Sequence, residues 1–425
     1  MPLNTVKLSE GVEGLFVKNE RFNTTLISFN FYLPLRNETV ADNALLPFLL
    51  TTCSNKYPDF SKLNYKLDKL YGAQLCASSE KAGDYQLLKV SISVIGNKYT
   101  LDNEDLTTEA CDMLFELIFS PSVQNGAFLE EDIKREKRKA VEHIKGELSD
   151  KRIYSKQRLI GEMYKGEPYG VPKCGTEEQI NSVTGESLYR AWKNMIESAY
   201  ISVNVISGTM PSDLFYRVSD KFSCVERKNI TDVSLTAPTA EIETPKEITE
   251  RMEISQGKLV MGFSSKLSGS GDEVLPLSVM CDIFGGGPYS KLFLNVREKM
   301  SLCYYCSASS IKTKGLITVD SGVEEQNAQK AKNEILNQLK ALQNGELTDF
   351  EFSSSLKSMS DSLKTYNDSQ ELLDTWYSLR VVSGGPVSPE EMAQDIVKVT
   401  KQQVIDAAKG VKLHTVYRLL PLEVK

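Results

Sequence analysis

The sequence is poor in histidine, with only His143 and His414 among its 425 residues. Histidine is the commonest metal ligand and the usual proton carrier near neutral pH. No HExxH, HxxEH or HxH pattern occurs, so the common histidine-based zinc-hydrolase sites are excluded. The sequence also lacks a run of about 18 uncharged apolar residues and the basic start followed by an apolar stretch that marks a signal peptide. We therefore expect a cytoplasmic protein that does not span a membrane.

Positive charge is not in excess either, because 50 basic side chains stand against 57 acidic ones, for a net charge of −7. This balance gives no electrostatic reason to expect a nucleic-acid partner. The charged run from Glu130 to Lys139 mixes both signs, which is typical of a solvated helix face with ion pairs. With 41% hydrophobic residues, the composition is that of a folded globular protein.

The eight cysteines are scattered, apart from Cys303 and Cys306, which have CxxC spacing. No second ligand pair lies near them, and their surroundings have the pattern of a strand. Residues three apart on a regular strand point to opposite faces, so the two sulfurs should not converge on a metal. We expect buried free thiols in a reducing compartment, and no metal or cofactor bound by this chain.

An internal repeat is the strongest structural signal in the sequence. The 34 residues from Ser61 align without gaps with those from Ser290, and both copies begin Ser-Lys-Leu. Each copy reads as an amphipathic helix, a polar hairpin and an alternating strand. Each is preceded by a strand and an apolar helix, and each is followed by an amphipathic helix and then a longer charged one.

The repeat predicts an α+β fold in two similar domains, each a mostly antiparallel sheet covered by helices on one face. Residues 231–250 are rich in Thr, Pro, Ala and Glu and lack apolar periodicity, so we interpret them as a linker. The expected domains are therefore residues 1–230 and 251–425.

Two further patterns in the chain resemble those of a known family. Residues 285–293 read GGGPYSKLF and are followed by VREKMSLCY at 296–304. Residues 168–170 read PYG, and Gly175, Thr176 and a strand at 201–206 follow. These patterns resemble the glycine-rich turn, the Arg/Tyr motif and the segment ending the first domain in M16 (insulinase-type, pitrilysin-like) peptidases. The resemblance covers essentially the whole chain and implies the duplicated M16 (LuxS/metallohydrolase-like) architecture. It is closest to the non-catalytic, YmfF-like "inactive domain" type.

In active M16 members, an HxxEH motif on a helix binds zinc, and a glutamate from a later helix completes the site. The resemblance implies that Pro47 and Thr51 stand at the two histidine positions and that Leu50 replaces the glutamate base. His143, or Glu142 if the register slips, falls near the third ligand. A single imidazole or carboxylate cannot hold catalytic zinc. The zinc motif is thus expected to be degenerate, with His143 an ordinary surface residue of a helix.

The Arg/Tyr motif, in contrast, is intact at Arg297 and Tyr304. A guanidinium and a phenol are donors suited to a peptide carbonyl and to the oxyanion formed when water attacks it. On residue types alone, Arg297 could instead pair with an acid on its helix, and Tyr304 could pack in the sheet. Gly285, Gly286 and Gly287 would allow close backbone approach, either to a substrate or between helix and sheet.

The resemblance implies a catalytically inactive M16 homologue that pairs with a zinc-bearing HxxEH subunit. In such a heterodimer, Arg297 and Tyr304 would contact the peptide substrate in trans. The alternative is a non-proteolytic peptide-binding or scaffold protein, which could be a homodimer. Replacing Arg297 and Tyr304 discriminates between the two, because only the first function predicts lost turnover in an assembled complex.

Overall fold

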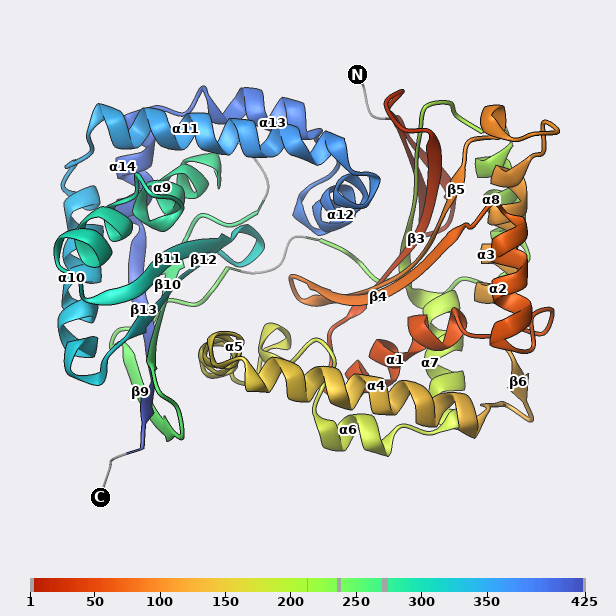
Figure 1. Ribbon diagram of the computed structural model, residues 1–425, viewed down its shortest axis with the longest axis horizontal. Helices are drawn as coiled ribbons and strands as arrows, with labels where there is room; N and C mark the ends of the chain where they lie inside the picture. Colours follow the sequence, from red (N-terminus) through yellow and green to blue (C-terminus); the bar gives the residue numbers. More distant parts are fainter. Residues whose placement is uncertain (1–3, 212, 235–237, 270–273, 423–425) are drawn as a thin grey trace. The chain divides into compact units, whose positions relative to one another are not determined.

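The computed structural model describes residues 4–211, 213–234, 238–269 and 274–422 (Figure 1). The strands are β1 Asn4–Ser9, β2 Val12–Lys18, β3 Thr24–Pro34, β4 Gln74–Ala82, β5 Tyr85–Ile95, β6 Val123–Gln124, β7 Ala127–Phe128, β8 Tyr200–Ser207, β9 Lys246–Met252, β10 Gly257–Ser265, β11 Cys303–Ile311, β12 Leu316–Val323 and β13 Val411–Pro421. The α-helices are α1 Val40–Leu50, α2 Phe60–Lys69, α3 Leu106–Phe119, α4 Glu130–Ser149, α5 Lys151–Met163, α6 Glu177–Ser182, α7 Gly185–Ser198, α8 Leu214–Ser223, α9 Leu275–Gly285, α10 Glu325–Gln343, α11 Asp349–Lys364, α12 Gln370–Arg380, α13 Pro389–Ile396 and α14 Lys401–Lys409. A π-helix, η4, spans Leu292–Lys299. Within the described ranges, no helix is both long and apolar enough to cross a membrane.

Two large sheets share one strand order, which confirms the predicted duplication. The first sheet has the order β1-β2-β8-β3-β5-β4, and the second, starting from its other edge, has the order β9-β13-β10-β12-β11. Strands β2, β8, β3, β5 and β4 therefore correspond to β9, β13, β10, β12 and β11. In each sheet one pair is parallel, β2 with β8 and β9 with β13, and the remaining pairs are antiparallel. The α+β class with mostly antiparallel sheets is confirmed.

The first compact unit comprises residues 1–145, 171–233 and 367–381. Alternate residues of β3, including Ile27, Phe29 and Phe31, point to one face of the sheet and are fully buried. They pack with the apolar sides of α1 and α3, whose residues recur at three- and four-residue spacing. This face of the sheet forms the larger hydrophobic core of the unit.

The second compact unit comprises residues 146–170, 234–366 and 382–425. Its central strand β10 buries Leu259, Met261 and Phe263 completely, all on one face. The Phe263 ring meets the Phe284 ring of α9 edge-on, with ring centroids 6.3 Å apart. The helical cover therefore repeats that of the first unit, with α9 in the place of α1.

Each unit also contains a helix from the other half of the sequence. In the first unit α12 lies on the second face of the sheet, where Asp374 accepts hydrogen bonds from Ser28 and Asn204. Figure 1 shows the blue α12 beside the red and orange strands. In the second unit α5 covers the corresponding face, and Leu159 and Met163 pack with Val260. The helices α5 and α12 follow α4 and α11 in their respective halves, so the exchange is reciprocal.

The compact units differ from the sequence-based division at 1–230, 231–250 and 251–425 in two respects. Residues 146–170 and 367–381 cross between the units, because each sheet presents a second face that a helix must cover. Strand β9 begins at Lys246, inside the stretch expected to be a linker, and pairs in parallel with β13. Residues 235–237 of that stretch lie outside the described residues.

Candidate functional site

The last turn of α1 carries the three positions implied to be a degenerate zinc motif. Pro47 is buried inside the helix and has no donor or acceptor on its side chain. Leu50 is fully buried in the hydrophobic core. The Thr51 hydroxyl donates to the carbonyls of Pro47 and Phe48, both at 3.1 Å. All three side chains thus contribute to packing or to the helix end, and their chemistry does not fit a catalytic zinc ion.

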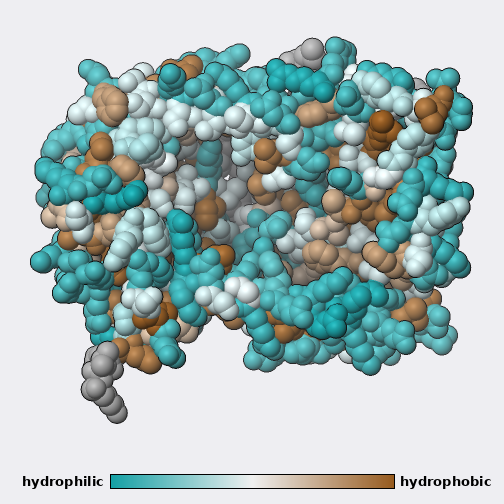
Figure 2. Space-filling view, in the orientation of Figure 1, coloured by the Kyte–Doolittle hydropathy of each residue, from teal (hydrophilic) through white to brown (hydrophobic). Residues whose placement is uncertain are grey.

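Helix α4 places His143 on its exposed face. The buried side of the helix is formed by Ile133 and Glu136, and the partly buried Ile144 continues it. Glu142 is also exposed and pairs with Arg138 at 3.9 Å. The mixed charges of this helix form ion pairs along a hydrophilic surface (Figure 2), so the predicted solvated face is confirmed.

Sequence reasoning missed the buried carboxylates of α4. Glu136 is 4% exposed and accepts from Arg135 and Lys139 at 3.1 and 2.9 Å. One turn earlier, Asp132 accepts a hydrogen bond from the Cys53 thiol at 3.4 Å. Burial, with the nearby Asp132 charge, raises the Cys53 pKa to about 12, so this thiol stays protonated. The three-residue step from Ile133 to Glu136 is the signal that places Glu136 on the buried side of the helix.

No group of three or more His, Cys, Asp or Glu side chains in the described ranges is arranged to hold a metal ion. This includes the end of α1 and the whole of α4, where the family resemblance would place zinc ligands. Cys53 does lie next to Asp132, but the other oxygen of that carboxylate accepts a hydrogen bond from Arg135 at 2.8 Å. We therefore derive no metal chemistry from these residues.

The glycine-rich turn in the second unit brings a helix close to a sheet. A Cβ at Gly285 would lie 2.5 Å from the backbone nitrogen of Ala308 on β11. Of the two uses considered for these glycines, the structure shows helix–sheet approach at Gly285. At Gly287, a Cβ would lie 2.8 Å from the ring of Tyr289. That ring is fixed, because its hydroxyl donates to the partly buried Asp282 at 2.7 Å, and the partial burial raises the Asp282 pKa.

Arg297 lies on η4, which winds as a π-helix, whereas its counterpart α2 in the first repeat is an α-helix. Single π turns within helices are rare and occur frequently at functional sites. The Arg297 guanidinium lies 4.7 Å from the centre of the Phe293 ring and 3.4 Å from a Glu298 carboxylate oxygen. Its side chain remains 41% exposed. The expected ion pair on the same helix is therefore present, and it leaves the guanidinium accessible.

Tyr304 projects from a β-bulge at the start of β11. The register with β12 shifts between Cys303 and Tyr305, so Tyr304 has no partner in the ladder. Its side chain is 61% exposed, and its hydroxyl donates to Glu324 at 3.4 Å. Packing of Tyr304 within the sheet, the alternative considered from the sequence, is therefore not what the structure has.

The same bulge overturns the expectation for the two neighbouring cysteines. Cys303 and Cys306 were expected to point to opposite faces of a regular strand, but both are buried and their thiols are hydrogen-bonded to each other. The extra residue at Tyr304 resets the alternation of the strand. The bond to Cys306 lowers the Cys303 pKa, and the charge of Arg297 lowers it further. The charge of Arg297 thus reaches Cys303, and Tyr304 stands on the bulge between the two cysteines.

A polar cavity of about 470 Å³ opens beside the bulge. It is lined by Tyr305 and by residues of α5 and β10, including Arg152 and Lys258. Both cations lie over the Tyr305 ring, at 4.5 and 5.5 Å from its centre. The aromatic surface of Tyr305 on β11 and the cations of α5 and β10 therefore lie together beside the bulge.

Comparisons with known proteins agree with this architecture. A family model described as the Peptidase M16 inactive domain matches residues 182–359. The "Probable inactive metalloprotease YmfF" of Bacillus subtilis is 29% identical over 415 residues, which cover 96% of both chains. The chain is therefore similar to inactive M16 peptidase homologues, over residues 182–359 to the family model and over nearly its full length to YmfF.

Two other relatives are similar over most of the chain. The "Uncharacterized zinc protease YmxG" of Bacillus subtilis is 25% identical over 338 residues, covering 77% of this chain and 80% of that one. The crystal structure of a conserved protein from Enterococcus faecalis has a TM-score of 0.91 at 26% identity and covers 100% of this chain and 99% of that one. The duplicated fold is therefore common to this chain and that structure along their full lengths.

Proposed function

We propose that this M16 homologue is the non-catalytic subunit of a heterodimeric zinc peptidase and contacts the peptide substrate in trans. The observation that carries the proposal is the exposure of both donors: Tyr304 is 61% exposed on a bulge, and the Arg297 side chain is 41% exposed. Neither side chain is used in a core. Both are donors of the kind that a peptide carbonyl requires.

The chemistry assigned to the pair is stabilisation of the scissile carbonyl. Exposed ion pairs such as Arg297 with Glu298 are weak, so the guanidinium can exchange Glu298 for a substrate oxygen at little cost. Tyr304 can likewise replace its long hydrogen bond to Glu324 by one to the substrate. As water attacks the carbonyl, both donors would strengthen their hold on the oxyanion.

Zinc and the base that activates water would come from the partner subunit. At the positions implied for these groups, this chain has Pro47, Leu50 and Thr51, whose side chains are committed to packing and to the end of α1. The partner is thus expected to be an M16 homologue with an intact HxxEH motif. Among the relatives, YmxG is named as an uncharacterized zinc protease.

Mixing the purified chain with an HxxEH homologue from the same genome tests the proposal. We expect a stable complex by analytical ultracentrifugation and peptide turnover that the homologue lacks when alone. Metal analysis of each separated subunit should assign the zinc to the partner. If no complex forms and the homologue cleaves peptides equally well alone, the proposal fails, and a peptide-binding or scaffold function remains.

A further inference from the structure

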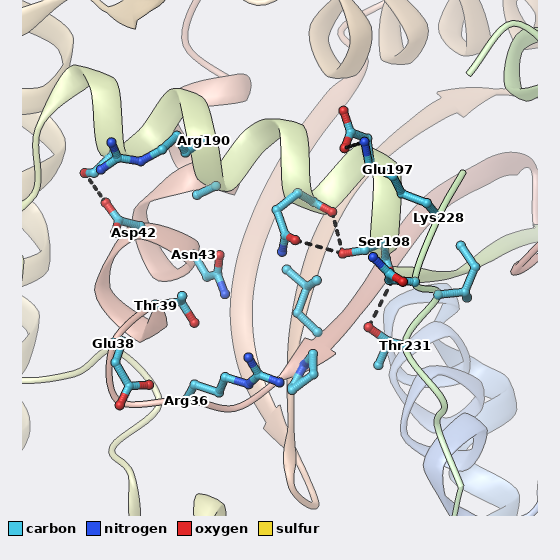
Figure 3. A pocket seen from close by; sticks show the side chains of 17 residues that line it. Arg36, Glu38, Thr39, Asp42, Asn43, Arg190, Glu197, Ser198, Lys228 and Thr231 are labelled. Atoms are coloured by element: carbon cyan, nitrogen blue, oxygen red, sulfur yellow. Dashed lines mark hydrogen bonds and ion pairs between the residues drawn. The ribbon is translucent and has the colours of Figure 1, made fainter. Parts of the chain in front are cut away.

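A second cavity, with a volume of about 650 Å³, lies entirely within the first compact unit. It opens between the first half of α1, the helix α7 and residues 228–231 (Figure 3). Its volume is in the range of small-molecule sites, about 300–1,000 Å³. None of its lining residues takes part in the proposed Arg297 and Tyr304 chemistry, so it requires its own explanation.

The side chain of Asn43 lines this cavity and is the clearest sign of a missing ligand. Asn43 is only 2% exposed, and its carboxamide points into the space between α1 and α7 (Figure 3). Its backbone N–H bonds to Thr39, but its carboxamide makes no hydrogen bond within the described part of the chain. Because the carboxamide faces the cavity, its oxygen can accept from a polar ligand and its NH2 group can donate to one.

Two arginines line the cavity, Arg190 on α7 and Arg36 just before α1 (Figure 3). Neither makes an ion pair with any residue that the structure describes. The N-cap residue Thr39 does not use its hydroxyl to cap α1, so the positive end of this 11-residue helix also faces the cavity. A guanidinium fork and a helix N-terminus together suit a carboxylate.

The loop that carries these groups is held in place before any ligand binds. The backbone N–H of Leu35 donates to the backbone carbonyl of Asp84 at 2.9 Å, and the Gln179 side chain donates to the Asn37 carbonyl at 2.9 Å. On the opposite wall, Ser187 of α7 donates to Asp42 of α1. Preorganisation of this kind lowers the entropic cost of binding.

Negative groups in the lining restrict the charge of the ligand. Glu38 has no ion pair within the described ranges, Glu197 pairs with Lys228 at 3.2 Å, and Asp42 lies near Arg190. These carboxylates would repel a dianion such as a phosphate group and would attract an ammonium group. The lining therefore suits a molecule with one negative and one positive end.

We propose that this cavity binds a free amino acid or short peptide in its zwitterionic form. The α-carboxylate lies at Arg36, Asn43 and the start of α1, and the ammonium group lies toward the acidic side chains. This site is separate from the proposed peptidase function, because it requires no partner subunit and no zinc.

Isothermal titration of the full chain with trialanine tests the proposal. We expect saturable one-site binding that weakens at least about tenfold for trialanine amide and for N-acetyl-trialanine, since each lacks one charge. The variants Arg36→Gln and Asn43→Leu should each weaken trialanine binding to a similar extent. Arg36 is exposed, so Arg36→Gln retains the fold even if Asn43→Leu does not. Arg138→Gln, on the exposed face of α4, is the matched control and should bind normally.

Several results would overturn the proposal. Absence of saturable binding would do so, as would equal affinity for the amide and the free peptide. Tighter binding of inorganic phosphate than of trialanine would show that the site takes a simple oxyanion instead. Equal losses in the Arg36→Gln and Arg138→Gln variants would show a general charge effect.

Discussion

Gly285 is the residue at which α9 comes closest to β11, and it tests the packing beneath the Arg/Tyr motif. In Gly285→Ala the new Cβ would meet the backbone nitrogen of Ala308 at 2.5 Å, which cannot move without disturbing the sheet. We expect a loss of about 1–3 kcal/mol in unfolding free energy, measured by urea denaturation.

The matched control is Gly146→Ala on α4, where a Cβ would meet nothing within 4 Å. Alanine is a better helix former than glycine, so this variant should gain about 0.5–1 kcal/mol. Equal effects of the two substitutions would show that α9 does not approach β11 as closely as described.

His414 makes the stability of the protein depend on pH near neutrality. It is 3% exposed, and burial, with the nearby charge of Lys246, lowers its pKa. The folded state keeps the His414 ring neutral. The unfolded chain therefore binds more protons than the folded one when the pH falls below the ordinary histidine pKa of about 6.5. Unfolding free energy should therefore decrease on acidification through this range, by at most about 1.4 kcal/mol per pH unit from this group.

The measurement is the unfolding free energy by urea denaturation of the native chain and of the variants His414→Gln and His143→Gln. The pH runs from about 7.5 to about 5.5, a range that brackets the ordinary histidine pKa. The slope should flatten in His414→Gln, whereas the exposed His143 serves as the control and should leave it unchanged. An unaltered slope in His414→Gln would contradict the assignment.

At the same scale, Tyr304 shows what the sequence could and could not predict. The motif predicts that Arg297 and Tyr304 act together, and the structure shows that both side chains are accessible. The bulge was not predictable from strand alternation, because it depends on the register with β12. The prediction for the directions of Cys303 and Cys306 was wrong for the same reason.

At the scale of elements, the reciprocal exchange of α5 and α12 is the main feature that the sequence did not reveal. Both helices had the amphipathic pattern of cover helices, but periodicity does not state which sheet a helix covers. On α12 the contact face is polar, with Gln370, Asp374 and Ser378 all buried. A search of the sequence for apolar stripes therefore does not detect the buried polar contacts that hold α12 against the sheet.

Asp374 is central to the contact of α12 with the first sheet. It accepts from Ser28 and Asn204 and forms an ion pair with Lys89, and both charged side chains are largely buried. Removing one partner of a buried pair leaves the other uncompensated. Asp374→Ala should therefore lower unfolding free energy by about 3–5 kcal/mol in urea denaturation.

Asp361→Ala on α11 is the control for Asp374→Ala, because Asp361 also forms an ion pair, with Lys364, but in an exposed position. Its effect should stay within about 0.5 kcal/mol. If Asp374→Ala behaved like Asp361→Ala, the polar contacts of α12 would not stabilise the first unit.

At the scale of the whole molecule, the duplication was predictable because two sequence copies preserve the same order of elements. The strand order confirms it, including the matching parallel pairs β2–β8 and β9–β13. The limits of the compact units were not predictable, since they depend on which half supplies each cover helix. The cavity containing Asn43 was also missed, because it combines residues from three distant segments.

The central claim is that Arg297 and Tyr304 act on a substrate bound by another subunit. The most direct test is the peptide turnover of the complex between the zinc-bearing partner and the double variant Arg297→Gln/Tyr304→Phe. We predict that this complex assembles like the native one but has a kcat lower by about 100-fold or more, as expected when oxyanion donors are lost. Unchanged turnover in a fully assembled complex would contradict the claim.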